Sequence, residues 1–288
     1  MKQTEIKYKL TKFIHSFDSL WNEALADELV SLRYNDYHLI GMPNRGSYST
    51  TSAYYNEYQK NFRHEKQLIG EWKQAPYLEL PNFQRLSNFY EGHGLVPLTE
   101  EELISQEAVL KLKCGLKIIQ LVPDCFGSVN KLISCIQVIA SNGPEYDASY
   151  SHPDIPFSVF VSICEGMSFE QSIRVAEGIL HEAMHLKLTL IQRYIKFVYP
   201  HTEDTYYSPW RGSSRPLMGV LHGIFVFRAI RDFFVLLIQN YTLPNQCIEH
   251  LSHRITDIQD EFNAVKDFPQ CQGLTQAGRT LAQRLLQV

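Results

Sequence analysis

The stretch SFEQSIRVAEGILHEAMHLKLTLIQRY, residues 168–194, decides most of the fold. Ser168 and Gln171 have the spacing of a capping box, so we predict a helix that begins here and runs to about Tyr194. Apolar residues then recur at intervals of three and four, which predicts one buried stripe formed by Ile173, Ala176, Leu180, Met184, Leu188 and Ile191. A long amphipathic helix of this kind has to lie against the core.

The same stretch contains the motif HEAMH. His181 and His185 are four residues apart, which places both side chains on one face of the helix, beside the buried stripe. Such a pair can bind one divalent metal ion. The alternative is a chance HExxH string whose histidines are ordinary core or surface residues. The helical context and the adjacent Glu182 favour the metal.

Composition narrows the class of protein. The chain has 288 residues, is 44% hydrophobic and carries a net charge of −4, which argues against a nucleic-acid-binding surface. Its six cysteines contain no CxxC pair, and the first residues lack the apolar core of a signal peptide. The most apolar stretch, residues 218–238, is interrupted by Arg228, Arg231 and Asp232. We expect a cytoplasmic protein with reduced thiols and no membrane or nucleic-acid partner, its oligomeric state being left open.

The order of elements predicts an α+β protein that is mostly helical. Residues 1–110 read as mostly helical, with a polar, tyrosine-rich interruption near residues 44–58 and a capping box at Thr99 and Glu102 that starts a helix to about Leu112. The runs LKIIQLVPDCF, KLISCIQVIAS and PFSVFVSIC are predicted to be strands of a small antiparallel sheet. After Gly166 the helical period returns. Residues 1–110 and 111–288 are the two expected regions, which could also form one continuous domain.

A second informative segment is SPWRGSSRPLMGVLHGIFVF, residues 208–227. Ser214 is predicted to cap a helix with Pro216 in its first turn, and the apolar pattern continues to about Gln239. His222 lies inside this helix, and Arg215, seven residues earlier, is expected on nearly the same face. Arg211 is expected in the preceding loop. A lone histidine here is more often a core residue, but a histidine pair that needs a third ligand makes His222 a candidate.

The identity of the third metal ligand distinguishes the possible classes of metal site. A metzincin would need a glycine and a histidine where this chain has Leu188 and Ile191, so that class is excluded. A thermolysin-like zinc peptidase takes a glutamate from a following helix, whereas Glu203 and His201 lie in HTEDTYYSPW, which we predict to be a loop. With His222 as ligand, three neutral imidazoles and nearby arginines suit a metal with a bound dicarboxylate.

The segments HEAMHLKL and PWRGSSRPLMGVLHGIFVF resemble the HExxH-type peptide β-hydroxylases, which modify ribosomally made peptides with Fe(II), 2-oxoglutarate and O2. The resemblance is strongest over residues 165–240. It implies three iron ligands, His181, His185 and His222, and it implies that Arg211 and Arg215 bind the carboxylates of 2-oxoglutarate. The implied substrate is a precursor peptide hydroxylated at a side-chain β-carbon.

Glu182 matches the motif, but its role is left open between orienting a metal-bound water and orienting a ligand. The main alternative function is a zinc metallopeptidase of the thermolysin-like HExxH type, in which Glu182 would be the general base. A second alternative is a peptide-binding protein without enzymatic activity.

Overall fold

The computed structural model describes residues 2–16, 20–39, 76–141, 143, 147–152 and 158–287. The interruption predicted near residues 44–58 lies outside these ranges. Contacts group the chain into two compact units. Unit 1 contains residues 1–22 and 187–288, and unit 2 contains residues 23–186, a grouping that differs from the division expected near residue 110. The long helix α9 (Phe169–Gln192) contributes residues to both units.

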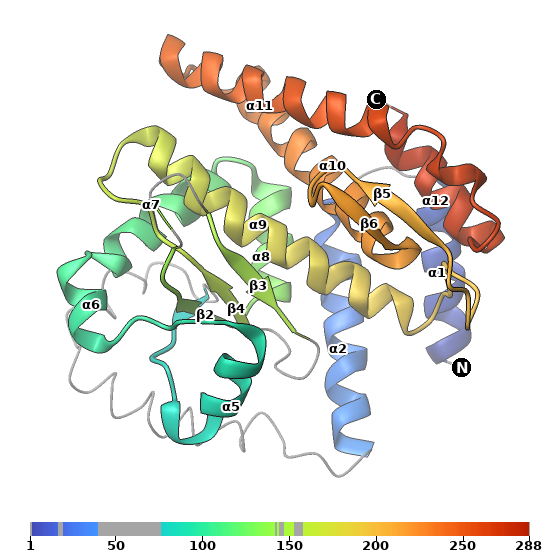
Figure 1. The fold of residues 1–288 in the computed structure, drawn as a ribbon, viewed down its shortest axis with the longest axis horizontal. Helices are drawn as coiled ribbons and strands as arrows, with labels where there is room; N and C mark the ends of the chain where they lie inside the picture. Colours follow the sequence, from blue (N-terminus) through green and yellow to red (C-terminus); the bar gives the residue numbers. More distant parts are fainter. Residues whose placement is uncertain are drawn as a thin grey trace. The chain divides into compact units, whose positions relative to one another are not determined.

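Unit 2 is built on a four-stranded mixed sheet with the order β1-β2-β4-β3. Figure 1 labels β2, β4 and β3 of this sheet. The strands are β1 (Tyr77–Leu78), β2 (Cys135–Val138), β3 (Ser149–Ser151) and β4 (Ser158–Val161). β2 pairs in parallel with β1 and β4, and only the pair β3–β4 is antiparallel. The strands predicted in KLISCIQVIAS and PFSVFVSIC are confirmed. The predicted strands β2 and β4 pair in parallel, so the antiparallel arrangement predicted for them is wrong, and β3, the antiparallel partner of β4, was not predicted.

Both faces of this sheet are covered, which is why all four residues of β4 are buried. Successive side chains of a strand point to opposite faces. Phe160 packs against Tyr90 in α5 (Phe83–His93). Its neighbour Val161 faces Gly178 in α9. The sheet therefore lies between α5 and α9, and α9 is held in place by burial.

The run LKIIQLVPDCF is helical, so the strand predicted there is wrong. It contains the end of α7 (Ala108–Gln120) and the start of α8 (Pro123–Leu132). Pro123 occupies the first turn of α8, where its missing N–H is not needed. A short apolar run fits a buried helix as well as a strand, and here tertiary packing decides.

The capping box at Thr99 and Glu102 is confirmed: the Thr99 N–H donates to the Glu102 carboxylate at 2.7 Å, and the Glu102 N–H donates to Thr99 Oγ1 at 3.3 Å. The helix it starts, α6 (Glu100–Ser105), ends earlier than predicted. Glu107 has a left-handed backbone with a φ of 53°, which interrupts the helix before α7 begins.

The helix α9 begins as predicted. The Ser168 N–H donates to Gln171 Oε1 at 2.5 Å, and the Gln171 N–H donates to Ser168 Oγ at 3.2 Å. All six residues of the predicted stripe are buried. A Cβ added to Gly115 of α7 would meet Val175 Cγ1 at 2.8 Å, so this glycine allows α7 to approach α9 closely.

Unit 1 contains the helices α1 (Lys2–Ser16), α10 (Leu217–Asn240), α11 (Asn245–Ala264) and α12 (Gln276–Leu286), with the hairpin β5 (Thr205–Ser208) and β6 (Ser213–Pro216). The helix α10 is apolar on nearly all sides and forms much of the core of this unit. Lys187 is fully buried, and its ammonium donates to the carbonyl of Leu20 at 2.5 Å. This bond ties α9 to the segment after α1.

Four predictions for this part of the chain are wrong. HTEDTYYSPW contains strand β5, and Ser214 does not cap a helix because it lies in β6, opposite Tyr207. Pro216 is the cap residue itself, and α10 starts at Leu217. The end of α10 near Gln239 is confirmed. Arg215 is therefore a strand residue, so the helical face that it was expected to share with His222 does not exist.

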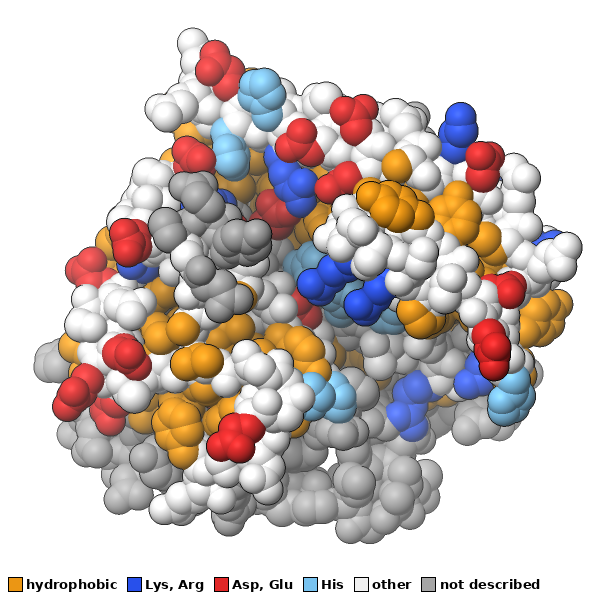
Figure 2. Space-filling model, viewed as in Figure 1, with side chains coloured by type: hydrophobic (Ala, Val, Ile, Leu, Met, Phe, Trp, Pro, Cys, Tyr) orange, Lys and Arg blue, Asp and Glu red, His pale blue; other side chains and the backbone are white. Residues whose placement is uncertain are grey.

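Within the described ranges, no helix is both long and apolar enough to cross a membrane. On the face drawn in Figure 2, acidic and basic side chains of the described residues are interspersed. This distribution agrees with the small net charge of −4.

We expect Gly115→Ala to lower the free energy of unfolding by about 1–3 kcal/mol, because the new methyl group would press on Val175 and on the backbone of α9. Urea denaturation measures the effect. Gly92→Ala in α5 is the matched control, since a Cβ there meets no atom within 4 Å. It should be neutral or stabilising by up to about 1 kcal/mol. Equal destabilisation by both changes would contradict the close packing of α7 on α9.

Candidate metal centre

The two histidines of α9 converge on one point. His181 Nε2 and His185 Nε2 are 3.1 Å apart, and both rings are half-buried. Nitrogen ligands lie about 2.0–2.1 Å from a metal ion, so two of them at about 90–110° to each other are about 2.8–3.4 Å apart. The same distance is that of a hydrogen bond between the two ring nitrogens, and it also fits two adjacent ligand positions of one divalent ion. The prediction that both rings lie on one face of the helix is confirmed, and metal binding by them stays a prediction.

Glu182 lies on the inner side of the pair and is only 3% exposed. Its Oε2 accepts a hydrogen bond of 2.6 Å from Ser151 Oγ, while its Oε1 is 4.0 Å from His181 Nε2. A buried carboxylate requires such a donor, because burial otherwise disfavours its charge. Ser151 thus fixes one oxygen of Glu182 and leaves the other on the side of the histidines.

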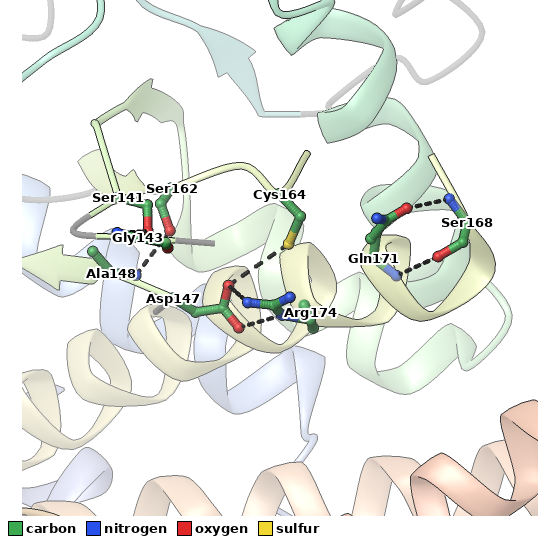
Figure 3. A network of polar contacts seen from close by, with 9 residues as sticks. All are labelled: Ser141, Gly143, Asp147, Ala148, Ser162, Cys164, Ser168, Gln171 and Arg174. Carbon is green, nitrogen blue, oxygen red and sulfur yellow. Dashed lines mark hydrogen bonds and ion pairs between the residues drawn. The ribbon is translucent and has the colours of Figure 1, made fainter. Parts of the chain in front are cut away.

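A polar network fixes the strand that carries Ser151 (Figure 3). Asp147, two residues before β3, receives two bonds from the Arg174 guanidinium of α9, at 2.8 and 3.0 Å. The next backbone N–H, of Ala148, donates to Ser162 Oγ at 2.8 Å. Cys164 donates to Asp147 at 3.6 Å, and burial and then the Asp147 charge raise the pKa of its thiol to about 11, which keeps the donor protonated. These contacts set where Ser151 meets α9.

His222 lies in α10, within unit 1, and is half-buried. Its Nε2 is 2.6 Å from the amide nitrogen of Gln192, the last residue of α9. The amide nitrogen donates and the ring nitrogen accepts. The lone pair that a metal would use is therefore occupied by Gln192, and metal binding by His222 requires exchange of this partner.

The two candidate arginines are on the hairpin of unit 1. Arg211 is in the turn, and Arg215 is in β6 opposite Tyr206. Both side chains are exposed. Among the described residues, neither guanidinium has an acidic partner. Two unpaired guanidinium groups on one short hairpin can bind carboxylates through forked hydrogen bonds.

Trp210 fixes this hairpin to α10. Its indole stacks on Phe227 with ring centroids 5.2 Å apart, and its Nε1 donates to Glu261 at 2.7 Å. A Cβ on Gly223 would be 2.5 Å from the indole, so only glycine permits this contact. Gly223 directly follows His222. The tryptophan thus sets the position of Arg211, its neighbour in the chain, over this part of α10.

The structure brings His181, Glu182 and His185 together. His222, Arg211 and Arg215 belong to unit 1, so the set of three histidines stays a prediction. In the part of the chain that the structure describes, no three His, Cys, Asp or Glu side chains are grouped to hold a metal ion. His201 and Glu203, the other candidate third ligands, are exposed.

Ser151, Gln192 and Trp210 were not predicted as site residues. Nothing in the sequence marks Ser151, because its role depends on β3 lying beside α9. Trp210 is close in sequence to Tyr206 and Tyr207, which is a signal of a contact surface, but clustered aromatic residues are as often packing groups.

Comparison of the chain with protein-family models and with curated proteins gave no match. The candidate metal centre rests on the positions of His181 and His185 and on the sequence motifs.

We expect Ser151→Ala to weaken binding of a divalent ion about tenfold, because Glu182 would lose the donor that holds it beside His181. Titration with Co²⁺, followed by visible absorption, measures the affinity. Ser149→Ala is the matched control, because Ser149 lies on the same strand and on the side of Gly178 in α9, and no bond to Glu182 is lost with it. Equal affinities in the two variants would show that Glu182 does not act through Ser151.

We expect Gly223→Ala to displace Trp210 and to lower the free energy of unfolding by about 1–3 kcal/mol. Loss of the indole contact should also change the intrinsic fluorescence spectrum. Gly219→Ala on the same helix is the control: the atoms nearest to its new Cβ, in Arg215, are 3.8 Å away, which is an ordinary contact. An unchanged fluorescence spectrum in Gly223→Ala would contradict the close packing of the Trp210 indole on Gly223.

Proposed function

We propose that this chain binds Fe(II) through the histidines of α9 and is a 2-oxoglutarate-dependent oxygenase that hydroxylates a peptide side chain at the β-carbon. The observation that carries the proposal is the distance of 3.1 Å between His181 Nε2 and His185 Nε2, which suits two adjacent ligand positions of one ion. The choice of oxygenase chemistry is supported by the arginines of the hairpin and by the sequence resemblance. The proposed substrate is a ribosomally made precursor peptide.

Each residue has a defined task in this proposal. His181 and His185 offer ring nitrogens to the metal, and His222 becomes the third ligand by releasing Gln192. Arg211 and Arg215, which have no acidic partner among the described residues, bind the two carboxylates of 2-oxoglutarate. Bound Fe(II) supplies the activation of O2 for hydroxylation of a C–H bond. The protein supplies binding, orientation and a sheltered position.

Glu182 serves as an orienting group in the proposed enzyme. Its bond to Ser151 holds a negative charge beside His181, where it raises the affinity for a cation. The carboxylate is only 3% exposed, so its position is set by the protein rather than by solvent.

A zinc metallopeptidase is the second candidate function, and one observation favours it. Glu182 Oε1 lies 4.0 Å from His181 Nε2, so this carboxyl group would stand beside a zinc ion held by the histidines and could serve as the general base of a hydrolase. In that case Glu182→Gln should abolish peptide cleavage while zinc stays bound. An oxygenase instead adds the mass of one oxygen to the peptide and leaves its backbone intact.

We expect the protein, kept anaerobic, to develop a visible charge-transfer band only when Fe(II) and 2-oxoglutarate are both present. His222→Ala should remove the band, because one metal ligand is lost. Arg211→Gln and Arg215→Gln should raise the 2-oxoglutarate concentration needed for half of the signal by about tenfold or more, since a charged partner of a carboxylate is lost. Absorption titration measures all four proteins.

His253→Ala is the control for the histidine variant, because His253 is an exposed residue of α11 in the same unit. It should leave the band unchanged. Absence of the band in the unaltered protein, together with full metal affinity in His222→Ala, would rule out the oxygenase and favour the zinc enzyme.

A further inference from the structure

Unit 1 contains a cavity of about 310 Å³ at a place that the proposed metal chemistry does not use. Its lining comes from α1, from the turn that follows α9 and from the start of α12. These segments are far apart in the sequence, so the cavity is a product of the fold of this unit. Its volume is at the lower end of the range of small-molecule sites, about 300–1,000 Å³.

Two lysines line the cavity, Lys7 from α1 and Lys196 from the turn after α9, and the lining residues include no Asp or Glu. His15 of α1 also lines the cavity. Neither Lys7 nor Lys196 has an acidic partner among the described residues. The chain as a whole has a net charge of −4, so this cluster is opposite in sign to the average surface. Like charges that share a cavity repel each other, and a bound anion removes that cost.

The remaining lining is largely apolar. Ile14 is only 2% exposed, Ile195 is half-buried, and Ala277 completes this surface together with Tyr194. An inorganic ion would gain no binding free energy from these apolar side chains. The hydrocarbon part of an organic ligand would be buried against them, which favours binding. The combination of cations and apolar side chains therefore selects a ligand that has both kinds of group.

We propose that this cavity binds a small organic anion. Its carboxylate or phosphate lies between Lys7 and Lys196, and its apolar part lies on Ile14 and Ile195. The anion is either a free small molecule or an acidic side chain at the edge of a bound peptide. The inference stands independently of the metal centre, because none of the lining residues belongs to it.

The test is a titration of the full chain with labelled isoleucine methyl groups, observed by nuclear magnetic resonance. Benzoate and phenyl phosphate are the anionic probes, benzamide is the neutral probe of similar shape, and a short peptide with one glutamate represents the second source. The signals are assigned through Ile14→Val and Ile195→Val. We expect saturable shifts of these two methyl signals with the anions and much weaker binding of benzamide.

The double change Lys7→Gln and Lys196→Gln should weaken binding of the anions about tenfold or more. Lys12→Gln is the matched control, because Lys12 is an exposed lysine of α1 that does not line the cavity. It should change the affinity by less than about twofold. Stronger binding of the peptide than of benzoate identifies a peptide side chain as the natural source, and the reverse identifies a small molecule.

Three outcomes would overturn the proposal: no saturable shift with either anion, equal binding of benzamide and benzoate, or equal weakening by Lys12→Gln and by the double change. The lysines are exposed on the surface of α1 and of the turn, so circular dichroism of the variants should match that of the unaltered chain.

Discussion

Burial of one face of α9 is the constraint on which the candidate site depends. Leu180, Met184 and Leu188 are fully buried, so a rotation of the helix by one residue would expose large apolar groups. Since each residue advances the helix by about 100°, fixing these side chains also fixes the direction of the two histidines. The direction of the two histidines is therefore a consequence of core packing.

Polar contacts fix the position of the Glu182 side chain beside the histidines. The Arg174–Asp147 pair and the bond from Ala148 to Ser162 settle the position of β3, and β3 in turn places Ser151 against Glu182. A hydrogen bond to a buried carboxylate is costly to lose. This chain of contacts shows how a short strand, only three residues long, can position the Glu182 carboxyl group beside the histidine pair.

The sequence predicted correctly the features that depend on a hydrophobic repeat or on a helix-capping motif. The stripe of α9, both capping boxes and the helical pair of histidines depend on neighbours within a few residues, and all were found. Prediction failed where the structure depends on residues that are distant in the sequence. The apolar run around Ile118 fits a strand as well as the helix that it forms. Ser214 pairs with a residue across a hairpin instead of capping a helix. Ser151 and Gln192 act through residues 31 and 30 positions away, which no local pattern reveals.

Lys187 gives the fold an internal reporter. Its amine is fully buried and bonded to the carbonyl of Leu20, so a reagent that modifies primary amines can reach it only when this part of unit 1 opens. The rate at which Lys187 acquires such a label, compared with that of an exposed lysine, measures the free energy of local opening. Labelling of Lys187, which is not one of the proposed site residues, therefore measures how often the structure around this end of α9 opens locally.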